Sequence, residues 1–297
     1  MENANKRAAV IEYVRDVQGF VISGYHISKL AQAPPGKMKI SLDLGLTTNE
    51  VTIGDGKVLL PDGQELDMAL LNRIARKREN EKCYLIENSS LMYIYLFENN
   101  HTYRLYEPHI DWPPTLWISG SMMHTVSVSK PVDEAGLKVN SLGGVHGKAL
   151  DTCFGLGYSA IKLLEHGAAE VATYEVSASV IEIAKANPWS RKVFGNKRIK
   201  VNNQDVYESV KLMHENSFDV IMHDPPNVKL EGKLYSLEFY KGLYRILKRG
   251  GRIYHFVGGG RIPLEHKVDY ASGVAKRLSE AGFKEVKKSY RGFTAIK

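Results

Sequence analysis

Three short segments of the sequence carry the side chains that could do chemistry. In the first, residues 151–157 read Asp-Thr-Cys-Phe-Gly-Leu-Gly. The second ends at Glu175, 18 residues after Gly157, and the third is the Asp-Pro-Pro-Asn tetrapeptide at residues 224–227. Glycines let a chain turn sharply into a helix without side chains that block a ligand. A carboxylate at the end of the next strand can accept hydrogen bonds from both ribose hydroxyls. The first two segments therefore predict a nucleoside-binding loop.

The acid at the entrance of this loop favours a cationic ligand. A pyrophosphate-binding loop normally adds a third glycine, and Asp151 would repel phosphates. S-adenosylmethionine fits better, since its ammonium and sulfonium tolerate Asp151 and its ribose suits Glu175. Asp205 could accept from the adenine amino group, although a helix N-cap at this position is equally compatible. The predicted cofactor-binding residues are Asp151, Thr152, Gly155, Gly157, Glu175, Val176, Asp205, Val206 and Asp224.

The tetrapeptide has the character of a reaction centre. Pro225 and Pro226 fix the backbone and present carbonyl groups without competing N–H donors. Asp224 adds a carboxylate, so the segment can hold an exocyclic amine of a nucleobase in line with a sulfonium methyl group. Asp224 is then a positioning acceptor first and a base second. The predicted catalytic residues are Asp224, Pro225, Pro226 and Asn227, and the alternative is a rigid turn that ends a strand.

Strands alternating with helices must position these segments. The pattern predicts strands at residues 148–152, 170–175, 199–202, 218–223, 251–257, 285–288 and 293–296, with helices at 158–166, 177–187, 206–213, 236–247 and 264–281. This alternation is typical of a doubly wound α/β fold, here a seven-stranded Rossmann-like sheet. His223 and His255 fall on its strands and are expected to be packed or hydrogen-bonded rather than ligands.

The sequence before residue 119 has a different texture. Short apolar runs are separated by Gly-Asp-Gly and Pro-Asp-Gly turn signals, a pattern typical of β-hairpins. One helix is expected over residues 66–78 and a further one over 132–142. The chain is thus predicted to hold a smaller β-rich N-terminal domain at residues 1–118, for substrate recognition, and a catalytic domain at residues 119–297.

Composition limits the class of protein. The 40 basic and 33 acidic residues give a net charge of +7, a mild attraction to a polyanion. The basic residues at 191–200 are expected to form a solvated face, and those at 229–261 either a solvated face or an RNA contact. Cys83 and Cys153 cannot form a disulfide framework, and no Cys/His cluster has zinc-ligand spacing. No apolar run is long enough for a membrane span. We expect a soluble, cytoplasmic protein without a metal.

Residues 120–297 resemble class I S-adenosylmethionine-dependent methyltransferases, and Asp-Pro-Pro-Asn resembles the Asn/Asp/Ser-Pro-Pro-aromatic signature of enzymes that methylate amino nitrogens of nucleobases. The whole sequence resembles a family of predicted archaeal RNA methyltransferases. The resemblance implies an RNA partner, ribosomal before transfer RNA, and rRNA modification at the 4-amino group of a cytidine with one or two methyl groups. Two positions depart from the pattern: Cys153 replaces the first glycine of the loop, and Asn227 replaces the aromatic residue.

Two other functions remain open on the same residues. One is a small-molecule transferase on this fold, either a methyltransferase or a polyamine aminopropyltransferase. Against the latter, the sequence lacks a Gly-Gly-Gly-Asp-Gly loop and a paired-acid gate. The other is a non-catalytic RNA-binding module, which the intact acids and the tetrapeptide disfavour.

Overall fold

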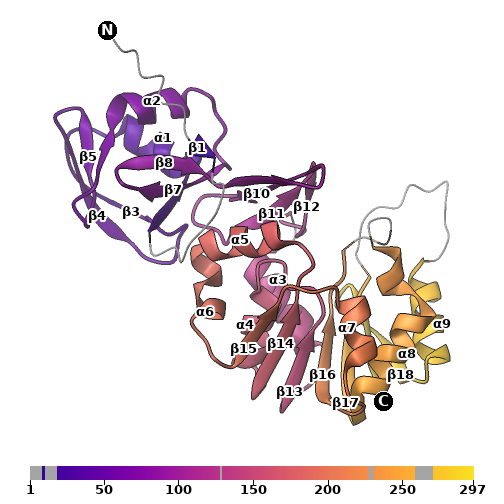
Figure 1. Ribbon diagram of the computed structural model, residues 1–297. Helices are drawn as coiled ribbons and strands as arrows, with labels where there is room; N and C mark the ends of the chain where they lie inside the picture. The colour runs from indigo at the N-terminus through magenta and orange to yellow at the C-terminus, as the bar shows by residue number, and fades with distance from the viewer. Residues whose placement is uncertain (1–8, 11–18, 128, 227, 229–230, 258–269) are drawn as a thin grey trace. The chain divides into compact units, whose positions relative to one another are not determined.

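The computed structural model describes residues 9–10, 19–127, 129–226, 228, 231–257 and 270–297 (Figure 1). The chain divides into two compact units. The first comprises Met1–Pro131 with Ser179–Arg191, and the second comprises Val132–Ala178 with Lys192–Lys297. Each unit has an apolar core of its own.

A large mixed sheet forms the second unit. Its strands are β13 (Lys148–Asp151), β14 (Glu170–Tyr174), β15 (Ile199–Asn202), β16 (Phe218–His223), β17 (Leu247–Phe256), β18 (Lys284–Ser289) and β19 (Gly292–Ile296). Their order across the sheet is β15-β14-β13-β16-β17-β19-β18. Neighbours from β15 to β17 are parallel, whereas β19 is antiparallel to β17 and β18. The prediction of an α/β, Rossmann-like fold is confirmed.

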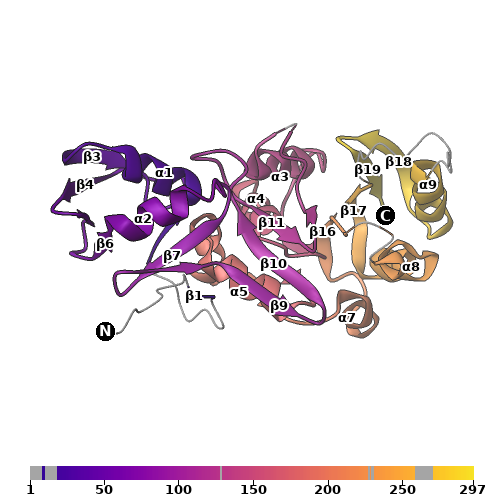
Figure 2. The same cartoon turned by 90° about the horizontal axis from the view of Figure 1, so that it is seen from above.

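Helices pack on this sheet through apolar side chains. The helices of the unit are α3 (Pro131–Asn140), α4 (Tyr158–Glu165), α6 (Arg191–Phe194), α7 (Val206–Leu212), α8 (Leu237–Ile246) and α9 (Tyr270–Glu280), with a 3-10 turn η2 (Gly232–Tyr235). Residues of α7, α8 and α9 share one core with β13, β16 and β17, and Figure 2 shows α8 and α9 beside β17–β19. In α8 the apolar positions recur at helical spacing, so Phe239, Leu243 and Ile246 all face this core. No helix in the described ranges is long and apolar enough to cross a membrane.

The first unit is built from three small sheets. Their orders are β1-β8-β7-β2, β3-β4-β5-β6 and β12-β11-β10-β9. The strands are β1 (Ala9–Val10), β2 (Phe20–Ser23), β3 (Gly36–Ile40), β4 (Asn49–Gly54), β5 (Lys57–Leu59), β6 (Glu65–Asp67), β7 (Cys83–Glu87), β8 (Ser90–Tyr93), β9 (Tyr95–Glu98), β10 (His101–Tyr106), β11 (Thr115–Ile118) and β12 (Ser121–Met122). The helices are α1 (Gly24–Gln32), α2 (Met68–Ala75) and α5 (Ala178–Ala186), with the 3-10 turn η1 (Pro188–Ser190).

Two local features of this unit differ from the predicted pattern. The helix predicted from residue 66 begins at Met68, because residues 65–67 pair as β6 and Asp67 caps the helix by accepting from the Ala69 amide at 2.7 Å. The helix α1 was not predicted. It begins at Gly24 and is held by a capping box, in which Ser23 and His26 exchange hydrogen bonds.

Candidate active site

The carboxyl ends of three neighbouring strands meet at one edge of the large sheet. Asp151, the last residue of β13, pairs in register with Thr173 on β14 and with Met222 on β16. The Thr152 amide donates to the Met222 carbonyl at 3.0 Å, so the pairing extends one residue beyond the strand. The sheet therefore brings the first and third predicted segments side by side. Ligands of open α/β sheets bind at such an edge, where the strand order reverses.

The loop after β13 has the conformation that its glycines predict. Gly155 has φ +55° and Gly157 has φ +75°, both in the left-handed region. A Cβ atom at Gly157 would lie 2.6 Å from Cε2 of Phe154 and 2.7 Å from Cγ2 of Val193. Only glycine fits there without strain. The turn leads directly into α4, as a nucleoside-binding loop requires.

Asp151 is the most unusual ionisable group of the site. Its side chain is fully buried, and Oδ2 accepts from Ser159 Oγ at 3.0 Å and Thr173 Oγ1 at 2.8 Å. Oδ1 is buried and has no hydrogen-bond partner among the described residues. Burial raises the pKa of Asp151 to about 7, against the two hydroxyl donors, with a further increase from the charges of Asp224 and Glu175. This carboxylate therefore lacks a cation or donor at one oxygen.

Glu175 connects the second strand to the loop. Its Oε2 accepts from the Gly155 amide at 3.2 Å, and its Oε1 accepts from the Ser177 amide at 3.0 Å. Burial raises the pKa of Glu175, although the backbone donors lower it. The next residue, Val176, is 63% exposed. Each Glu175 oxygen keeps a lone pair with which it could accept from a ribose hydroxyl.

Asp205 acts in this structure as the N-cap of α7. Its Oδ1 accepts from the Tyr207 amide at 2.9 Å, and its Oδ2 forms a 2.6 Å ion pair with Lys233. The N-cap alternative from the sequence is thus what the contacts show, while adenine contact stays a prediction. Val206 is buried in the core shared by α7 and α8.

The third segment follows β16 directly. Asp224 Oδ2 forms a 2.7 Å ion pair with Nζ of Lys138 on α3. The Pro226 carbonyl accepts from the Tyr235 hydroxyl at 2.7 Å, and the Pro225 carbonyl lies 3.4 Å from the same hydroxyl. Asn227, which was predicted to be catalytic, lies outside the described residues. The acceptors expected to hold a nucleobase amine are thus already bonded inside the protein.

Sequence reasoning missed Lys138. It lies 86 residues before Asp224, in a helix that the pattern predicted only as a lead-in to the sheet. A basic residue near the C-terminal end of an amphipathic helix is usually interpreted as a solvent-exposed cation that interacts with the helix dipole. Its side chain is in fact 6% exposed. The residues around Lys138 in the sequence give no signal that its side chain is buried.

Two buried histidines lie side by side at the ends of β16 and β17. The Nδ1 atom of His223 lies 2.7 Å from the Thr152 hydroxyl, and its Nε2 atom lies 3.0 Å from the Leu234 carbonyl. The Nε2 atom of His255 lies 2.6 Å from the Tyr240 hydroxyl. Burial lowers the pKa of both rings, that of His255 to about 3. Both rings are buried and hydrogen-bonded, as predicted.

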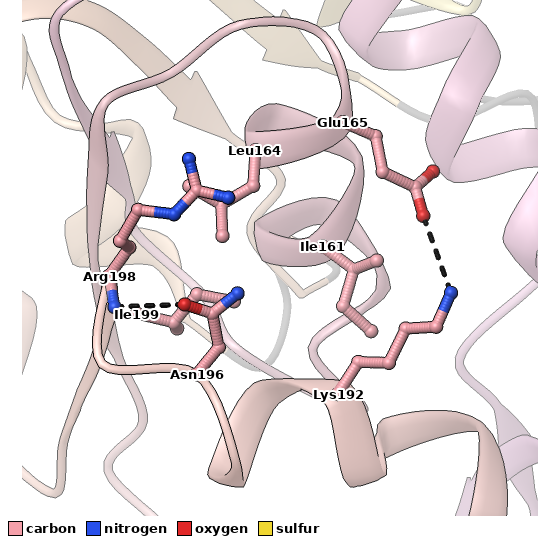
Figure 3. Close-up of a pocket in the computed structure, with 7 residues that line it drawn as sticks. All are labelled: Ile161, Leu164, Glu165, Lys192, Asn196, Arg198 and Ile199. Atoms are coloured by element: carbon pink, nitrogen blue, oxygen red, sulfur yellow. Dashed lines mark hydrogen bonds and ion pairs between the residues drawn. The ribbon is translucent and has the colours of Figure 1, made fainter.

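A surface hollow of about 210 Å³ lies away from this edge (Figure 3). It is lined by the end of α4 and the start of β15, with Glu165 and Lys192 3.9 Å apart across it. Because α4 starts at the carboxyl edge and runs toward the opposite edge of the sheet, this hollow is distinct from the loop and the acids described above. It is not the predicted binding site.

A family model, curated proteins and solved structures that match this chain point to the same family. The family described as Spermine/spermidine synthase domain matches residues 118–291. An uncharacterized protein of Methanocaldococcus jannaschii is 39% identical over 229 residues, 77% of this chain and 76% of that one. Polyamine aminopropyltransferase 2 of Streptomyces coelicolor is 28% identical over 148 residues, 48% of this chain but 26% of its own length. A crystal structure of a spermidine synthase with a transition-state analogue, AdoDATO, matches with TM-score 0.55 and 20% identity, over 67% of this chain and 70% of that one, and supports the fold.

These matches correct the predicted function. The assignment to RNA amino-methyltransferases is wrong, and with it RNA methylation, rRNA modification, the RNA partner and S-adenosylmethionine as a methyl donor. The physical reason lies in the tetrapeptide, because Asp224 is bonded to Lys138 and the Pro226 carbonyl to Tyr235. The family matches residues 118–291 although they lack the Gly-Gly-Gly-Asp-Gly loop, so the absence of that loop was a poor argument against an aminopropyltransferase.

Proposed function

Because the chain belongs to the spermine/spermidine synthase domain family, we propose that it is a polyamine aminopropyltransferase. The donor is decarboxylated S-adenosylmethionine and the acceptor is a small amine. The family match begins at residue 118, which supports a catalytic domain at 119–297 and a separate N-terminal domain at 1–118. Both cysteines are free thiols, which suits a reducing compartment such as the cytoplasm.

The acids at the sheet edge suit this donor. Asp224 and Glu175 both raise the pKa of Asp151, so the three negative charges act on one another. Lys138 offsets the charge of Asp224. A donor with an ammonium and a sulfonium brings two positive charges to the other two acids, Asp151 and Glu175, whereas a donor with its carboxylate intact would add a further negative charge. Oδ1 of Asp151, buried and without a described partner, is the acceptor that an ammonium can satisfy. This observation carries the proposal.

The rest of the loop supports the nucleoside part of the donor. The left-handed Gly155 and Gly157 leave room for close approach of a ligand to the backbone. Glu175 is placed beside that turn by its hydrogen bond to the Gly155 amide. We propose that Glu175 binds the ribose hydroxyls, that Val176 covers the adenine, and that Asp205 accepts from the adenine amino group.

The reaction is a substitution at carbon. The acceptor nitrogen attacks the propyl carbon bonded to sulfur, so an N–C bond forms while the C–S bond breaks. Both electrons of the broken bond stay on sulfur, which leaves as the neutral thioether of methylthioadenosine. The nitrogen is then a secondary ammonium, and its proton passes to Asp224 or to water. The protein contributes chiefly by holding the two reactants in line.

The direct test is donor turnover by the purified chain. Decarboxylated S-adenosylmethionine is offered with n-butylamine, 1,4-diaminobutane or longer polyamines, and released methylthioadenosine is measured by chromatography. Release that depends on an amine supports the proposal. The matched control is Asp219→Asn, because Asp219 also pairs with a lysine, Lys248, but at the opposite end of β16 from Asp224. Equal loss in Asp224→Asn and Asp219→Asn would contradict the role of Asp224.

A further inference from the structure

Lys138 is buried against Asp224, the carboxylate proposed to take the proton of the attacking nitrogen. Its side chain is 6% exposed and that of Asp224 is 23% exposed, with 2.7 Å between Nζ and Oδ2. The same ammonium lies 3.9 Å from the ring centroid of Phe256, at the end of β17. A buried ammonium held by a carboxylate on one side and an aromatic face on the other is strongly fixed. The solvent-exposed part of Asp224 therefore belongs to a carboxylate that is already paired with the Lys138 ammonium.

The charges around this pair leave Asp224 as the counter-ion of Lys138. Glu134 lies one helical turn earlier on α3, but it is paired with Arg291 at 3.0 Å. Arg291 in turn also lies over the Phe256 ring, with Cζ 5.5 Å from its centroid. Tyr254 on β17 donates its hydroxyl to the Tyr290 carbonyl at 2.6 Å. Lys138 and Asp224 thus form one neutral pair, and Glu134 and Arg291 form the other.

Resting on the proposed function, we propose that Lys138 is a positioning residue that makes the site take its acceptor as an uncharged amine. A bare carboxylate binds an alkylammonium and so holds the nitrogen in its protonated, non-nucleophilic form. A carboxylate already neutralised by Lys138 offers an acceptor for an N–H group but no net charge for a second ammonium. The lone pair of the incoming nitrogen then stays available for attack on the donor carbon.

The number of protons released when an amine binds measures this directly. At pH 8 an alkylamine is almost entirely protonated in water, because its pKa is near that of lysine, about 10.4. A site that binds the free amine must release about one proton per molecule, whereas a site that binds the ammonium releases about none. The probes are n-butylamine and 1,4-diaminobutane, titrated by calorimetry in buffers of different ionisation enthalpy, with methylthioadenosine present.

Variants of Lys138 separate the effect of its positive charge from the effect of its size and shape. The wild-type protein and Lys138→Arg are expected to release about one proton per butylamine, and Lys138→Met and Lys138→Gln about none. Loss of the cation should also shift relative affinity toward the diamine by about tenfold, since one like-charge repulsion is removed. Lys211→Met removes an equally charged side chain that is paired with Glu208 on α7, and it is expected to behave as wild type.

Three results would overturn the inference: no proton release by the wild type, equal release by Lys138→Met or Lys138→Gln and the wild type, or no amine binding by any of these proteins. Turnover is measured in parallel. Binding with the expected proton counts but no methylthioadenosine release from any amine would refute the proposed function and support the assignment of Lys138.

Discussion

Replacing the buried Asp151 by asparagine should change how stability depends on pH. Burial raises the pKa of Asp151 from 3.8 to about 7 in the folded chain. Between these values the folded state holds a proton that the unfolded state has lost, so this group stabilises the fold at low pH. The stabilisation disappears as the pH rises through 7. With these two pKa values, the loss between pH 5 and pH 8 is roughly 2.5 kcal/mol.

Asp151→Asn removes that titration and keeps most of the contacts. An amide oxygen can accept from Ser159 and Thr173, as Oδ2 of the aspartate does. The amide nitrogen would take the place of Oδ1 and lack an acceptor, which costs about 1–3 kcal/mol at every pH. Because this cost is the same at every pH, it cancels when the free energies of unfolding at two pH values are subtracted.

Urea denaturation followed by circular dichroism at pH 5 and pH 8 checks this prediction. The wild type should lose roughly 2.5 kcal/mol more than Asp151→Asn between the two conditions. The variant should also bind decarboxylated S-adenosylmethionine more weakly at pH 8, because the ammonium loses its charged partner. Equal pH dependence of the two proteins would refute the reasoning about Asp151.

Three further changes have defined outcomes. Gly157→Ala should lower the free energy of unfolding by roughly 2–5 kcal/mol, because φ is +75° and the new methyl group would meet Phe154 and Val193; a melting temperature equal to wild type would contradict this. Asp224→Asn should lower kcat by about 10²-fold or more while calorimetry shows the donor still bound, and unchanged kcat would exclude the assigned role. Burial lowers the pKa of His255 to about 3, so its contribution to stability falls as the pH drops below its unfolded value of about 6.5. His255→Phe should therefore lose roughly 2 kcal/mol less than wild type between pH 8 and pH 5 in urea denaturation, and identical losses would count against it.

The central strands β13, β14 and β16 could be predicted because each is a short, largely apolar run followed by a turn or a helix signal. Residues 199–202 and 218–223 have the predicted bounds as β15 and β16. The strand β17 was predicted from residue 251 but begins at Leu247. The helix predicted over residues 236–247 ends at Ile246, and the strand begins at the next residue and runs through Gly250.

The helix α1 was harder, because its signals depend on pairs of side chains. Gly24 stands at its first position and three further residues, Tyr25, His26 and Ile27, are weak helix formers. Its N-terminus is fixed by Ser23 and His26, and His26 in turn contacts Asp111 at 3.1 Å, 85 residues away. Contacts across such separations are set by the fold and leave no periodic pattern in the sequence.

The site was predicted in part, and the error lay in the reaction. In the proposed function, the loop, the acid on β14 and the segment after β16 bind an adenosine sulfonium, the part that methyl and aminopropyl donors share. The contacts that occupy Asp224 and the Pro226 carbonyl come from Lys138 and Tyr235, whose side chains reach the segment only in the folded chain.

The most direct measurement is methylthioadenosine release by the purified chain. With decarboxylated S-adenosylmethionine and an amine we expect stoichiometric methylthioadenosine and aminopropylated amine, and Asp224→Asn should form both more slowly by about 10²-fold or more. If no amine yields methylthioadenosine, or if the chain transfers a methyl group from S-adenosylmethionine to RNA instead, the assignment to aminopropyl transfer is contradicted.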